Sequence, residues 1–319
     1  MNKSAVVYVC LIILVIDLFT IVFSFRALND AEKKNTFNEN YEDVQISNGE
    51  TEMLLASDVP IPDKISFAGE RTPLERIDIR EALTKELIVY TYLHSHTIQI
   101  MKKVPRYFAV IEPILKKVGL PEDFKYLAVI ESGLEPLAVS PSGAVGLWQF
   151  MEKTAKEYGL EINNEVDERY NIEKATYAAA DYLKKMHDKF GTWTMAAAAY
   201  NAGGNMINKQ IDTQNERTYY SLLLGEETER YVFRILAVKQ ILNHPELYHF
   251  YVENTYPVEA TRKYKIRKPV KNLALWAADH EISYKTLKRF NPWLRKNHLH
   301  DIKNKDYEIT IPRKTENYK

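Results

Sequence analysis

Residues 130–150 read IESGLEPLAVSPSGAVGLWQF and contain the most informative side chain of the chain, Glu131. Just before this stretch, Leu120-Pro121-Glu122-Asp123 is typical of a helix start, because proline and acidic residues favour the first turn. The apolar positions between Phe124 and Ile130 then leave one helical face for burial, and Ser132-Gly133 ends the helix. We therefore predict that Glu131 projects from the C-terminal end of a buried helix.

This position disfavours the ionised form of Glu131. The negative end of the helix dipole and apolar neighbours both raise the pKa of a carboxyl group. A carboxylic acid that stays protonated near neutral pH meets the requirement for a general acid. Position alone leaves a second interpretation equally open, in which Glu131 is one of 43 acidic residues and is simply solvated.

Two later segments favour the catalytic interpretation. GLWQF at 146–150 and AYNAG at 199–203 follow Glu131-Ser132 in the chain. This ordered set of motifs resembles the soluble lytic transglycosylase family, in particular its membrane-bound type-D branch, and more distantly goose-type lysozyme. The resemblance covers roughly residues 80–245. It implies a mainly α fold, with a lysozyme-like α-helical catalytic domain.

The resemblance also implies a reaction. Its substrate is the β-1,4 bond between N-acetylmuramic acid and N-acetylglucosamine in peptidoglycan glycan strands. Glu131 is expected to act alone, first as acid on the glycosidic oxygen and then as base on the muramic acid C6 hydroxyl, which closes a 1,6-anhydro ring. Water, metal ions and cofactors are expected to take no part. Most glycoside hydrolases use a pair of carboxylates instead.

Polar residues around GLWQF take supporting roles in this resemblance. Ser140 corresponds to the serine expected near the substrate acetamido group, and Gln149 to the amide that binds the glycan. Gln149 stands between two aromatic residues and needs a buried partner or a ligand, and the motif favours a ligand. Ser132 belongs to the matched set, although we expect it to cap the helix end more than to touch substrate. For Trp148 and Phe150 we favour a core position, with stacking against a sugar ring as the alternative.

Two further motifs supply candidate site residues, and the first of them is expected beside the catalytic acid. Tyr200 and Asn201 belong to AYNAG, where the tyrosine hydroxyl is expected to orient the carboxyl group or the substrate. Packing on one helical face explains Tyr200 almost as well. Glu227 and Tyr231 correspond to a Glu-Thr-x-x-Tyr element that lines the glycan groove in the family. Glu229 stands where this element usually has a basic residue, which is a departure from the family pattern.

Helical periodicity predicts a predominantly α-helical catalytic domain over residues 76–250. Asn171 is a good N-cap for one of its helices, which Gly191 ends. Thr192 then opens the helix that contains AYNAG, and we expect Gly203-Gly204 to close it.

The last segment has a different pattern. Residues 264–266 and 307–311 alternate like short strands, and 273–280 and 284–290 between them read as two short helices. This order resembles a small α+β LysM peptidoglycan-binding module, which we place at residues 256–314. Such modules usually carry Gly-Asp-Thr or Gly-Asp-Ser after the first strand, and this chain has Pro-Val-Lys-Asn there. The resemblance therefore extends to the fold more than to glycan binding.

The N-terminal stretch at residues 5–25, AVVYVCLIILVIDLFTIVFSF, is long and apolar enough to cross a bilayer as a helix. No small-x-small cleavage site follows, so we favour a retained anchor at residues 1–26 over an export signal. Cys10, the only cysteine, lies within it, so the exported part has no intramolecular disulfide. Residues 27–75 are polar and predict a disordered linker. We expect the chain on the periplasmic side of the cell envelope.

Two other functions remain open. A hydrolase on the same fold needs a second carboxylate to hold water, and Asp167 is the nearby candidate, although its neighbours indicate a loop tied by charge pairing. A non-catalytic peptidoglycan-binding protein is the other alternative, against which the intact Glu131, Gln149 and Tyr200 argue. The formal net charge is zero, so composition gives no sign of nucleic acid binding, and the eight histidines show no HExxH motif. Oligomeric state leaves no signal in the sequence.

Overall fold

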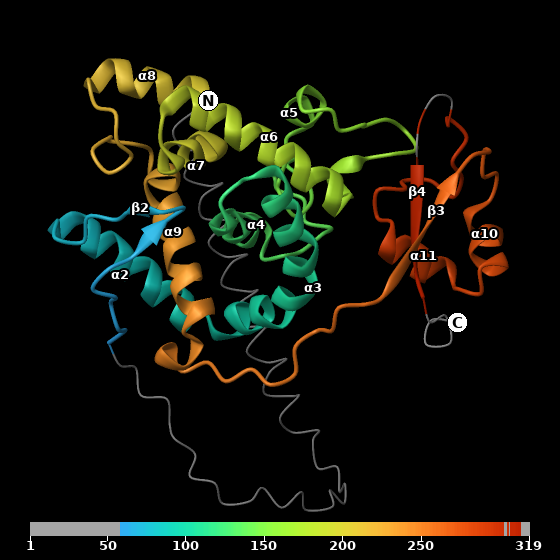
Figure 1. Cartoon of the computed structure of the whole chain (residues 1–319), viewed down its shortest axis with the longest axis horizontal. Helices are drawn as coiled ribbons and strands as arrows, with labels where there is room; N and C mark the ends of the chain where they lie inside the picture. The colour runs from blue at the N-terminus through green and yellow to red at the C-terminus, as the bar shows by residue number, and fades with distance from the viewer. Residues whose placement is uncertain (1–57, 303–304, 306, 314–319) are drawn as a thin grey trace, which may run out of the picture. The chain divides into compact units, whose positions relative to one another are not determined.

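The computed structural model describes residues 58–302, 305 and 307–313 of the 319-residue chain. The anchor predicted at residues 1–26 lies outside these residues. Within the part that the structure describes, no helix combines the length and the apolar character of a membrane span. The described chain is mainly helical, with a small pair of strands near its C-terminal end (Figure 1).

Helices build the domain that carries Glu131, as the sequence predicted. Asn171 Oδ1 accepts the N–H of Lys174 at 3.1 Å to cap α6, and Gly191 ends that helix with φ 81°. Gly203 ends α7, but Gly204 begins a further helix, α8, which the sequence analysis did not predict. The helices are α2 (Ile77–Tyr92), α3 (His94–Val118), α4 (Lys125–Ser132), α5 (Glu152–Glu157), α6 (Ile172–Phe190), α7 (Trp193–Ala202), α8 (Gly204–Gln214) and α9 (Glu226–Asn243), with single 3-10 turns at η1 (Glu122–Phe124), η2 (Glu168–Tyr170) and η3 (Pro245–Tyr248).

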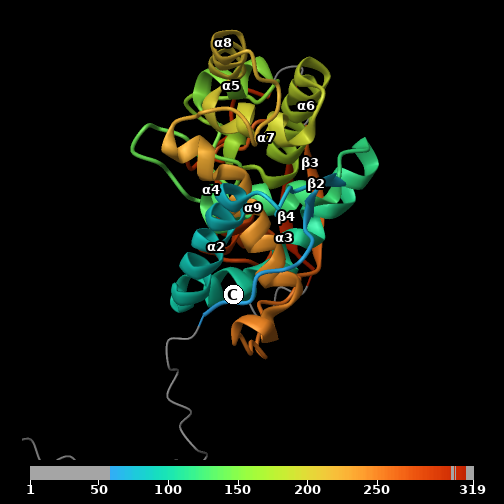
Figure 2. The ribbon, with the colours of Figure 1, turned by 90° about the vertical axis from the view of Figure 1, so that its left-hand side faces the viewer.

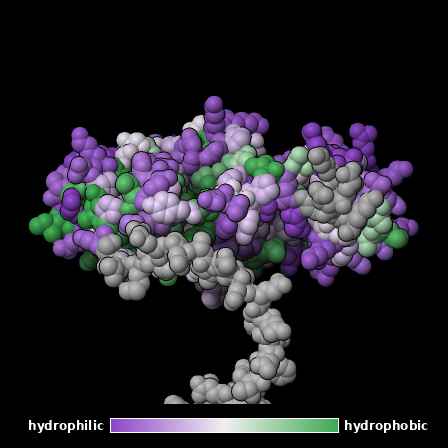
Figure 3. All heavy atoms as spheres, turned by 90° about the horizontal axis from the view of Figure 1, so that it is seen from below, coloured by the Kyte–Doolittle hydropathy of each residue, from purple (hydrophilic) through white to green (hydrophobic). Residues whose placement is uncertain are grey.

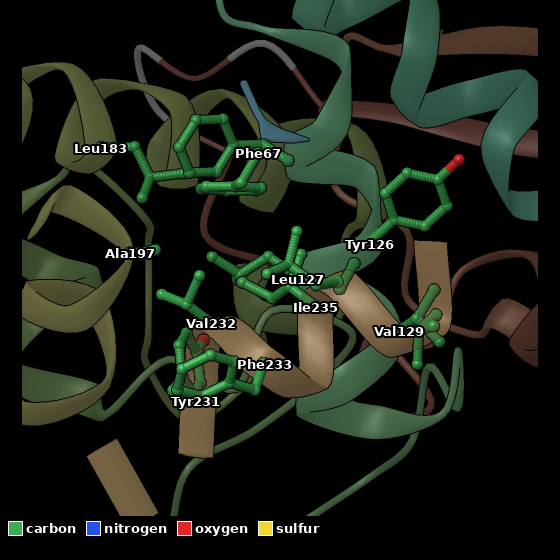
Figure 4. Close-up of a cluster of buried hydrophobic side chains, with 14 of the residues drawn as sticks. Phe67, Tyr126, Leu127, Val129, Leu183, Ala197, Tyr231, Val232, Phe233 and Ile235 are labelled. Atoms are coloured by element: carbon green, nitrogen blue, oxygen red, sulfur yellow. The ribbon is translucent and has the colours of Figure 1, made fainter. Parts of the chain in front are cut away.

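Helix α9 is the centre of the packing. Helices α2, α4 and α7 all contact it, and Figures 1 and 2 show α2 and α9 side by side. Val232 and Ile235 of α9 are fully buried against Leu127 of α4, in the cluster drawn in Figure 4. The alanines 196–199 of α7 are also fully buried, and their small side chains let α6 and α9 approach this helix closely. The core thus holds the ends of α4, α7 and α9 in fixed positions.

The linker predicted over residues 27–75 is wrong for its described part. Val59, Ile65 and Phe67 are buried in the main core, and β1 (Ser66–Phe67) pairs antiparallel with β2 (Glu70–Arg71). These apolar residues are too few and too irregularly spaced to produce a helix or strand pattern. Their partners lie far along the chain, so no local pattern indicates their burial.

The same segment caps a distant helix. Glu70 accepts the backbone N–H groups of Trp193 and Thr194, the latter at 2.9 Å, at the first turn of α7. A carboxylate at a helix N-terminus satisfies free donors and complements the helix dipole. Residues 58–75 therefore belong to the folded domain and support the helix that carries Tyr200 and Asn201.

The C-terminal segment forms the predicted β-α-α-β module. Strands β3 (Thr261–Ile266) and β4 (Tyr307–Pro312) pair antiparallel, and α10 (Leu273–Asp279) and α11 (Tyr284–Phe290) lie between them in the chain. Buried Asn291 ties α11 to β4, because its amide donates to the carbonyls of Leu287 and Thr310 and accepts the N–H of Thr310. The module therefore has an internal polar clamp as well as an apolar core.

Two connections join this module to the rest of the chain. Residues 251–260 run along α3, where the N–H of Tyr256 donates to the carbonyl of Lys102 at 2.7 Å (Figure 1). Val145 and Val166 of the helical domain belong to the same buried cluster as Leu294 of the module. The face shown in Figure 3 is mainly hydrophilic, with apolar side chains in small separate areas.

Candidate active site

Glu131 lies at the end of α4, as the sequence predicted. Leu127 and Ala128 face the core with no exposed surface, and Gly133 ends the helix with φ 59° and an N–H bond to the carbonyl of Val129 at 2.7 Å. A left-handed glycine is a usual helix C-terminus. The side chain of Glu131 remains half-buried at the edge of this core.

The surroundings of Glu131 make it a weak acid. Burial raises its pKa to about 7, and the nearby charge of Glu227 adds to the rise. The Tyr231 hydroxyl donates a hydrogen bond to Glu131 Oε1, and this bond and the charge of Arg234 act in the opposite direction. A carboxyl group with this pKa populates both its acid and its base form near neutral pH, which suits general acid and base catalysis.

Tyr231 and Glu227 of α9 act on the acid directly, and Asn201 at the end of α7 lies next to Glu227. Asn201 Nδ2 lies 3.5 Å from Glu227 Oε1, and Asn201 Oδ1 accepts the hydroxyl of Thr228 at 2.8 Å. Tyr231 is buried, and burial raises the pKa of its phenol well above the usual range, so it remains a hydrogen-bond donor. The structure therefore joins AYNAG to the Glu-Thr-x-x-Tyr element, as the resemblance implied.

The Tyr200 hydroxyl contacts the GLWQF segment and not the carboxyl group of Glu131. It donates to the backbone carbonyl of Trp148 at 2.7 Å, and the Tyr200 ring packs edge-on against Phe150 and Tyr182. Burial raises the pKa of Tyr200 and the charge of nearby Glu131 adds to the rise, but the tyrosine bound to the carboxyl group is Tyr231. Both tyrosines lie in sequence motifs, and only the folded structure shows which of them binds the Glu131 carboxyl group.

The GLWQF segment forms a tight turn that packs on the end of α4. Ser132 Oγ, which we expected to cap this helix, donates to the carbonyls of Ala128 at 3.1 Å and Leu147 at 3.0 Å. Gly146 has φ 80°, and a Cβ atom there would stand 2.2 Å from the carbonyl oxygen of Arg169. Only glycine therefore fits this position, and Ser132 joins the turn to the helix that carries Glu131.

Gln149 and Ser140 stabilise the loop around this turn. Gln149 has φ 48°, a left-handed conformation that costs about 1–2 kcal/mol for a residue with a side chain. Within the described residues its side-chain hydrogen bonds come from Nε2, which donates to the carbonyls of Gly146 at 2.8 Å and Ala138 at 3.3 Å. Ser140 Oγ accepts the N–H of Ala144 at 2.9 Å. Strain of this kind persists where the surroundings enforce it, and it is common at functional sites.

Comparison with known proteins agrees with this arrangement. The family described as Transglycosylase SLT domain matches residues 109–223, and the Soluble lytic transglycosylase C-terminal LysM-like domain matches residues 262–315. Membrane-bound lytic murein transglycosylase D of Escherichia coli K12 is 31% identical over 240 residues, which cover 73% of this chain and 52% of that protein. This chain carries an SLT transglycosylase domain. It is homologous to that murein transglycosylase, of which it spans about half the length.

Other proteins match shorter parts of this chain. Peptidoglycan transglycosylase gp16 of Escherichia phage T7 is 36% identical over 115 residues, 35% of this chain and 9% of that protein. Among solved structures, an inactive mutant of the lytic transglycosylase Slt from Pseudomonas aeruginosa is 22% identical, with a TM-score of 0.37, over 47% of this chain and 26% of that one. The SLT match includes Glu131 and Tyr200, whereas Glu227 and Tyr231 lie beyond its last residue.

The two aromatic residues of GLWQF belong to the core of the SLT domain, as predicted. Trp148 is fully buried and its indole N–H donates to the Thr176 hydroxyl at 2.9 Å, and Phe150 is buried as well. Sugar stacking on Trp148 is therefore excluded by its position. The remaining polar contacts of the segment come from its backbone and from Gln149.

Asp167 is tied to a guanidinium group, also as predicted. Arg169 donates to both carboxylate oxygens, at 3.0 and 2.7 Å, and both residues are buried. The same guanidinium donates to the carbonyls of Gly143 and Phe150, at 3.2 and 3.3 Å. Asp167 therefore supports the loop that holds Ser140 and Gln149.

Arg234 and Glu86 are charged residues near the site that are not predicted from the sequence. Arg234 follows Tyr231 by three positions, so the two share a face of α9, and its charge acts on Glu131. Glu86 of α2 is almost fully buried, accepts from Arg230 Nε at 2.6 Å and lies 3.9 Å from Arg234 Nε. The spacing of Arg234 from Tyr231 was a usable signal, whereas Glu86 becomes visible only once α2 packs on α9.

Proposed function

We propose that this chain is a peptidoglycan lytic transglycosylase with Glu131 as its single general acid and base. The observation that carries the proposal is the half-buried carboxyl group with a pKa of about 7, held by the Tyr231 hydroxyl. The SLT match and the homology to a murein transglycosylase support peptidoglycan as the substrate class. A carboxyl group with this pKa is able to give up a proton and take one back within a single turnover.

The proposed reaction conserves all atoms of the glycan. Protonated Glu131 gives its proton to the glycosidic oxygen between N-acetylmuramic acid and N-acetylglucosamine, and the C1–O4 bond breaks. The acetamido group of the muramic acid residue stabilises the cationic C1. The Glu131 carboxylate then removes the proton of the C6 hydroxyl, whose oxygen bonds to C1. The products are a free 4-hydroxyl and a 1,6-anhydro end, with Glu131 protonated again.

The neighbours of Glu131 receive roles from their contacts. Tyr231 orients the carboxyl group, and the charge of Glu227 helps to keep it protonated. We propose that Ser140, Gln149 and Asn201 bind the glycan, with Ser132 and Tyr200 holding the GLWQF turn against α4. Gln149 has its amide oxygen available for a sugar hydroxyl, since its Nε2 is the atom bound within the described loop.

Asp167 does not favour the hydrolase alternative. A hydrolase needs a carboxylate that holds water on the far side of the sugar from the acid. Both oxygens of Asp167 bind Arg169, which leaves this carboxylate committed to the loop.

We also propose the domain division drawn from the sequence, with the SLT domain now starting near residue 58. We propose in addition that the chain lies on the periplasmic side of the envelope, anchored by residues 5–25.

The test is an analysis of product ends. The full-length chain is incubated with purified peptidoglycan and the soluble products are examined by mass spectrometry. Anhydro ends are the expected result, whereas reducing ends identify a hydrolase and intact peptidoglycan with bound protein identifies a binding protein. Glu131→Gln is expected to release no product. The matched control is Glu135→Gln, a half-exposed acid four residues further on that pairs with Lys103 and is expected to retain activity.

A further inference from the structure

We propose that Glu165, His298 and His300 bind one divalent transition-metal ion, with Zn²⁺ as the expected occupant. The carboxylate and imidazole donor atoms of these residues all lie within 4.8 Å of one another. Glu165 lies between α5 and η2 of the SLT domain, whereas the two histidines lie between α11 and β4 of the LysM-like module. The site thus joins the two parts of the chain, and it uses no residue of the proposed catalytic site.

The backbone directs both histidines to the same side. Leu299, between them, is fully buried and pairs with Val270 in a β-bridge. Alternate residues of an extended chain face the same way, so His298 and His300 both point away from the side on which Leu299 packs. Their rings stack with centroids 4.3 Å apart and an interplanar angle of 17°. Two imidazoles are therefore presented together to Glu165.

The distances fit a metal ion. Glu165 Oε1 lies 3.4 Å from His298 Nε2 and 3.9 Å from His300 Nδ1. A tetrahedral zinc ion held about 2.0–2.1 Å from each donor separates its ligand atoms by roughly 3.3 Å. Small side-chain rotations are enough to close the three donors around such an ion, with water as the fourth ligand. Imidazole donors favour Zn²⁺ and its neighbours over Mg²⁺ and Ca²⁺.

Hydrogen bonds already orient two of the ligands. His298 Nδ1 donates to Asn297 Oδ1 at 2.9 Å, an arrangement that leaves the lone pair of Nε2 free to bind a metal. The backbone N–H of His300 donates to Glu165 Oε2 at 2.7 Å, so the other carboxylate oxygen, Oε1, faces the imidazoles. Metal-binding histidines and carboxylates typically have their second polar atom held in this way.

A bound ion would link the LysM-like module to the loop of the SLT domain that contains Asp167. Glu165 precedes Asp167, whose N–H donates to the carbonyl of Trp293 at 2.9 Å. Asp167 in turn holds Arg169, which binds the carbonyls of Gly143 and Phe150. Metal binding therefore stabilises the loop beneath the proposed glycan-binding residues without touching substrate.

No metal site is predicted from the sequence, because Glu165 is far from the two histidines along the chain. The spacing His-x-His is ambiguous by itself, and the third ligand comes from another domain. The signal appears only when the module packs against the 161–168 loop.

The test measures metal binding directly. The full-length chain in a Cys10→Ser background, which removes the only thiol, is freed of metal and titrated with ZnCl₂ in a calorimeter. We expect one equivalent to bind and the melting temperature to rise. His298→Ala and Glu165→Gln are each expected to weaken binding at least about 10-fold, and Asn297→Ala about 10- to 100-fold through loss of ligand orientation. His244→Gln, at an exposed histidine after α9, is the matched control and should bind as the parent does.

Three results would overturn the proposal. Failure of the parent chain to bind zinc at micromolar concentrations would show that the cluster is only a set of histidine–carboxylate contacts. Equal zinc binding by the parent and by His298→Ala would place the ion elsewhere. Binding of Mg²⁺ as tight as that of Zn²⁺ would contradict the assigned ligand set. Circular dichroism of each variant checks that lost binding does not reflect lost folding.

Discussion

At Glu131, the end of a buried helix produces an acid that is costly to ionise. Its pKa rises from 4.5 to about 7 on folding, chiefly through burial. Between these two values the folded chain binds the proton more tightly than the unfolded chain does, so stability falls as pH rises through this window. Above pH 7 a shift of this size lowers the free energy of unfolding by about 3 kcal/mol.

Glu131→Gln therefore separates activity from stability. The amide cannot donate the catalytic proton, so cleavage of peptidoglycan should disappear. The same change removes the cost of ionisation and should raise the free energy of unfolding by up to about 3 kcal/mol at pH 8, with little change at pH 4. Urea unfolding at the two pH values measures this difference. Equal stability of variant and parent at pH 8 would contradict the raised pKa.

In the proposed reaction, the Tyr231 hydroxyl is expected to set the upper end of the pH range for activity. That reaction begins with protonated Glu131, so kcat/KM should decline above a pH of about 7. The hydrogen bond from Tyr231 lowers the pKa of Glu131, so Tyr231→Phe should move this decline to higher pH while reducing kcat about 10-fold or more. Tyr182→Phe removes a hydroxyl that donates to the carbonyl of Ala199 and should leave the profile unchanged. A profile that stays fixed in Tyr231→Phe contradicts the positioning role.

At this scale the sequence predicted the acid but not its partner. Glu131 stood out because one short helix carries the apolar face, the acid and the Ser-Gly end. Tyr200 and Tyr231 both lie in motifs, and their assignment depends on how α7 and α9 cross. That crossing is set by side-chain packing from several helices, which no local pattern encodes.

Among the structural elements, the GLWQF turn depends on a glycine. Gly146 has φ 80° and stands where a Cβ atom would meet the Arg169 carbonyl oxygen at 2.2 Å. Gly146→Ala should therefore cost at least about 3 kcal/mol, of which the left-handed backbone alone accounts for about 1–2 kcal/mol. Gly159→Ala is the matched control, since Gly159 also has φ 80° but has no atom within 4 Å of a Cβ position. Similar losses in the two variants would show that the contact with Arg169 is unimportant.

Helices with strong local signals were predictable, and elements held by distant partners were not. Asn171 and Gly191 mark the ends of α6 in the sequence because capping acts on neighbouring residues. Residues 58–75 gave no such signal, since Phe67 and Glu70 act on helices that occur much later in the chain. Helix α8 was missed because Gly204, the second residue of a pair that normally ends a helix, begins it.

For the whole molecule, the two domains were visible in the sequence as a change of periodicity, but their shared core was not. Val145, Val166 and Tyr170 of the SLT domain are buried with residues of the LysM-like module, and Val166 pairs with Leu294 in a β-bridge. A module linked only by a flexible tether would leave these side chains exposed. The sequence suggested a separate binding module, whereas the packing makes it part of the support for the GLWQF loop.

Leu294→Ala tests this shared support. Leu294 is 1% exposed, so its truncation should cost about 2–5 kcal/mol and lower the melting temperature of the chain. Leu294 pairs with Val166, which directly precedes Asp167 and its partner Arg169. Loss of the Leu294 side chain should therefore also loosen this pair, and cleavage of peptidoglycan should fall together with stability near the new melting temperature. Leu275→Ala, at a side chain of the same module that is 64% exposed, should change neither quantity appreciably. Calorimetry distinguishes the alternatives, since a tethered module would give Leu294→Ala a separate early transition and leave the unfolding of the SLT domain at its original temperature.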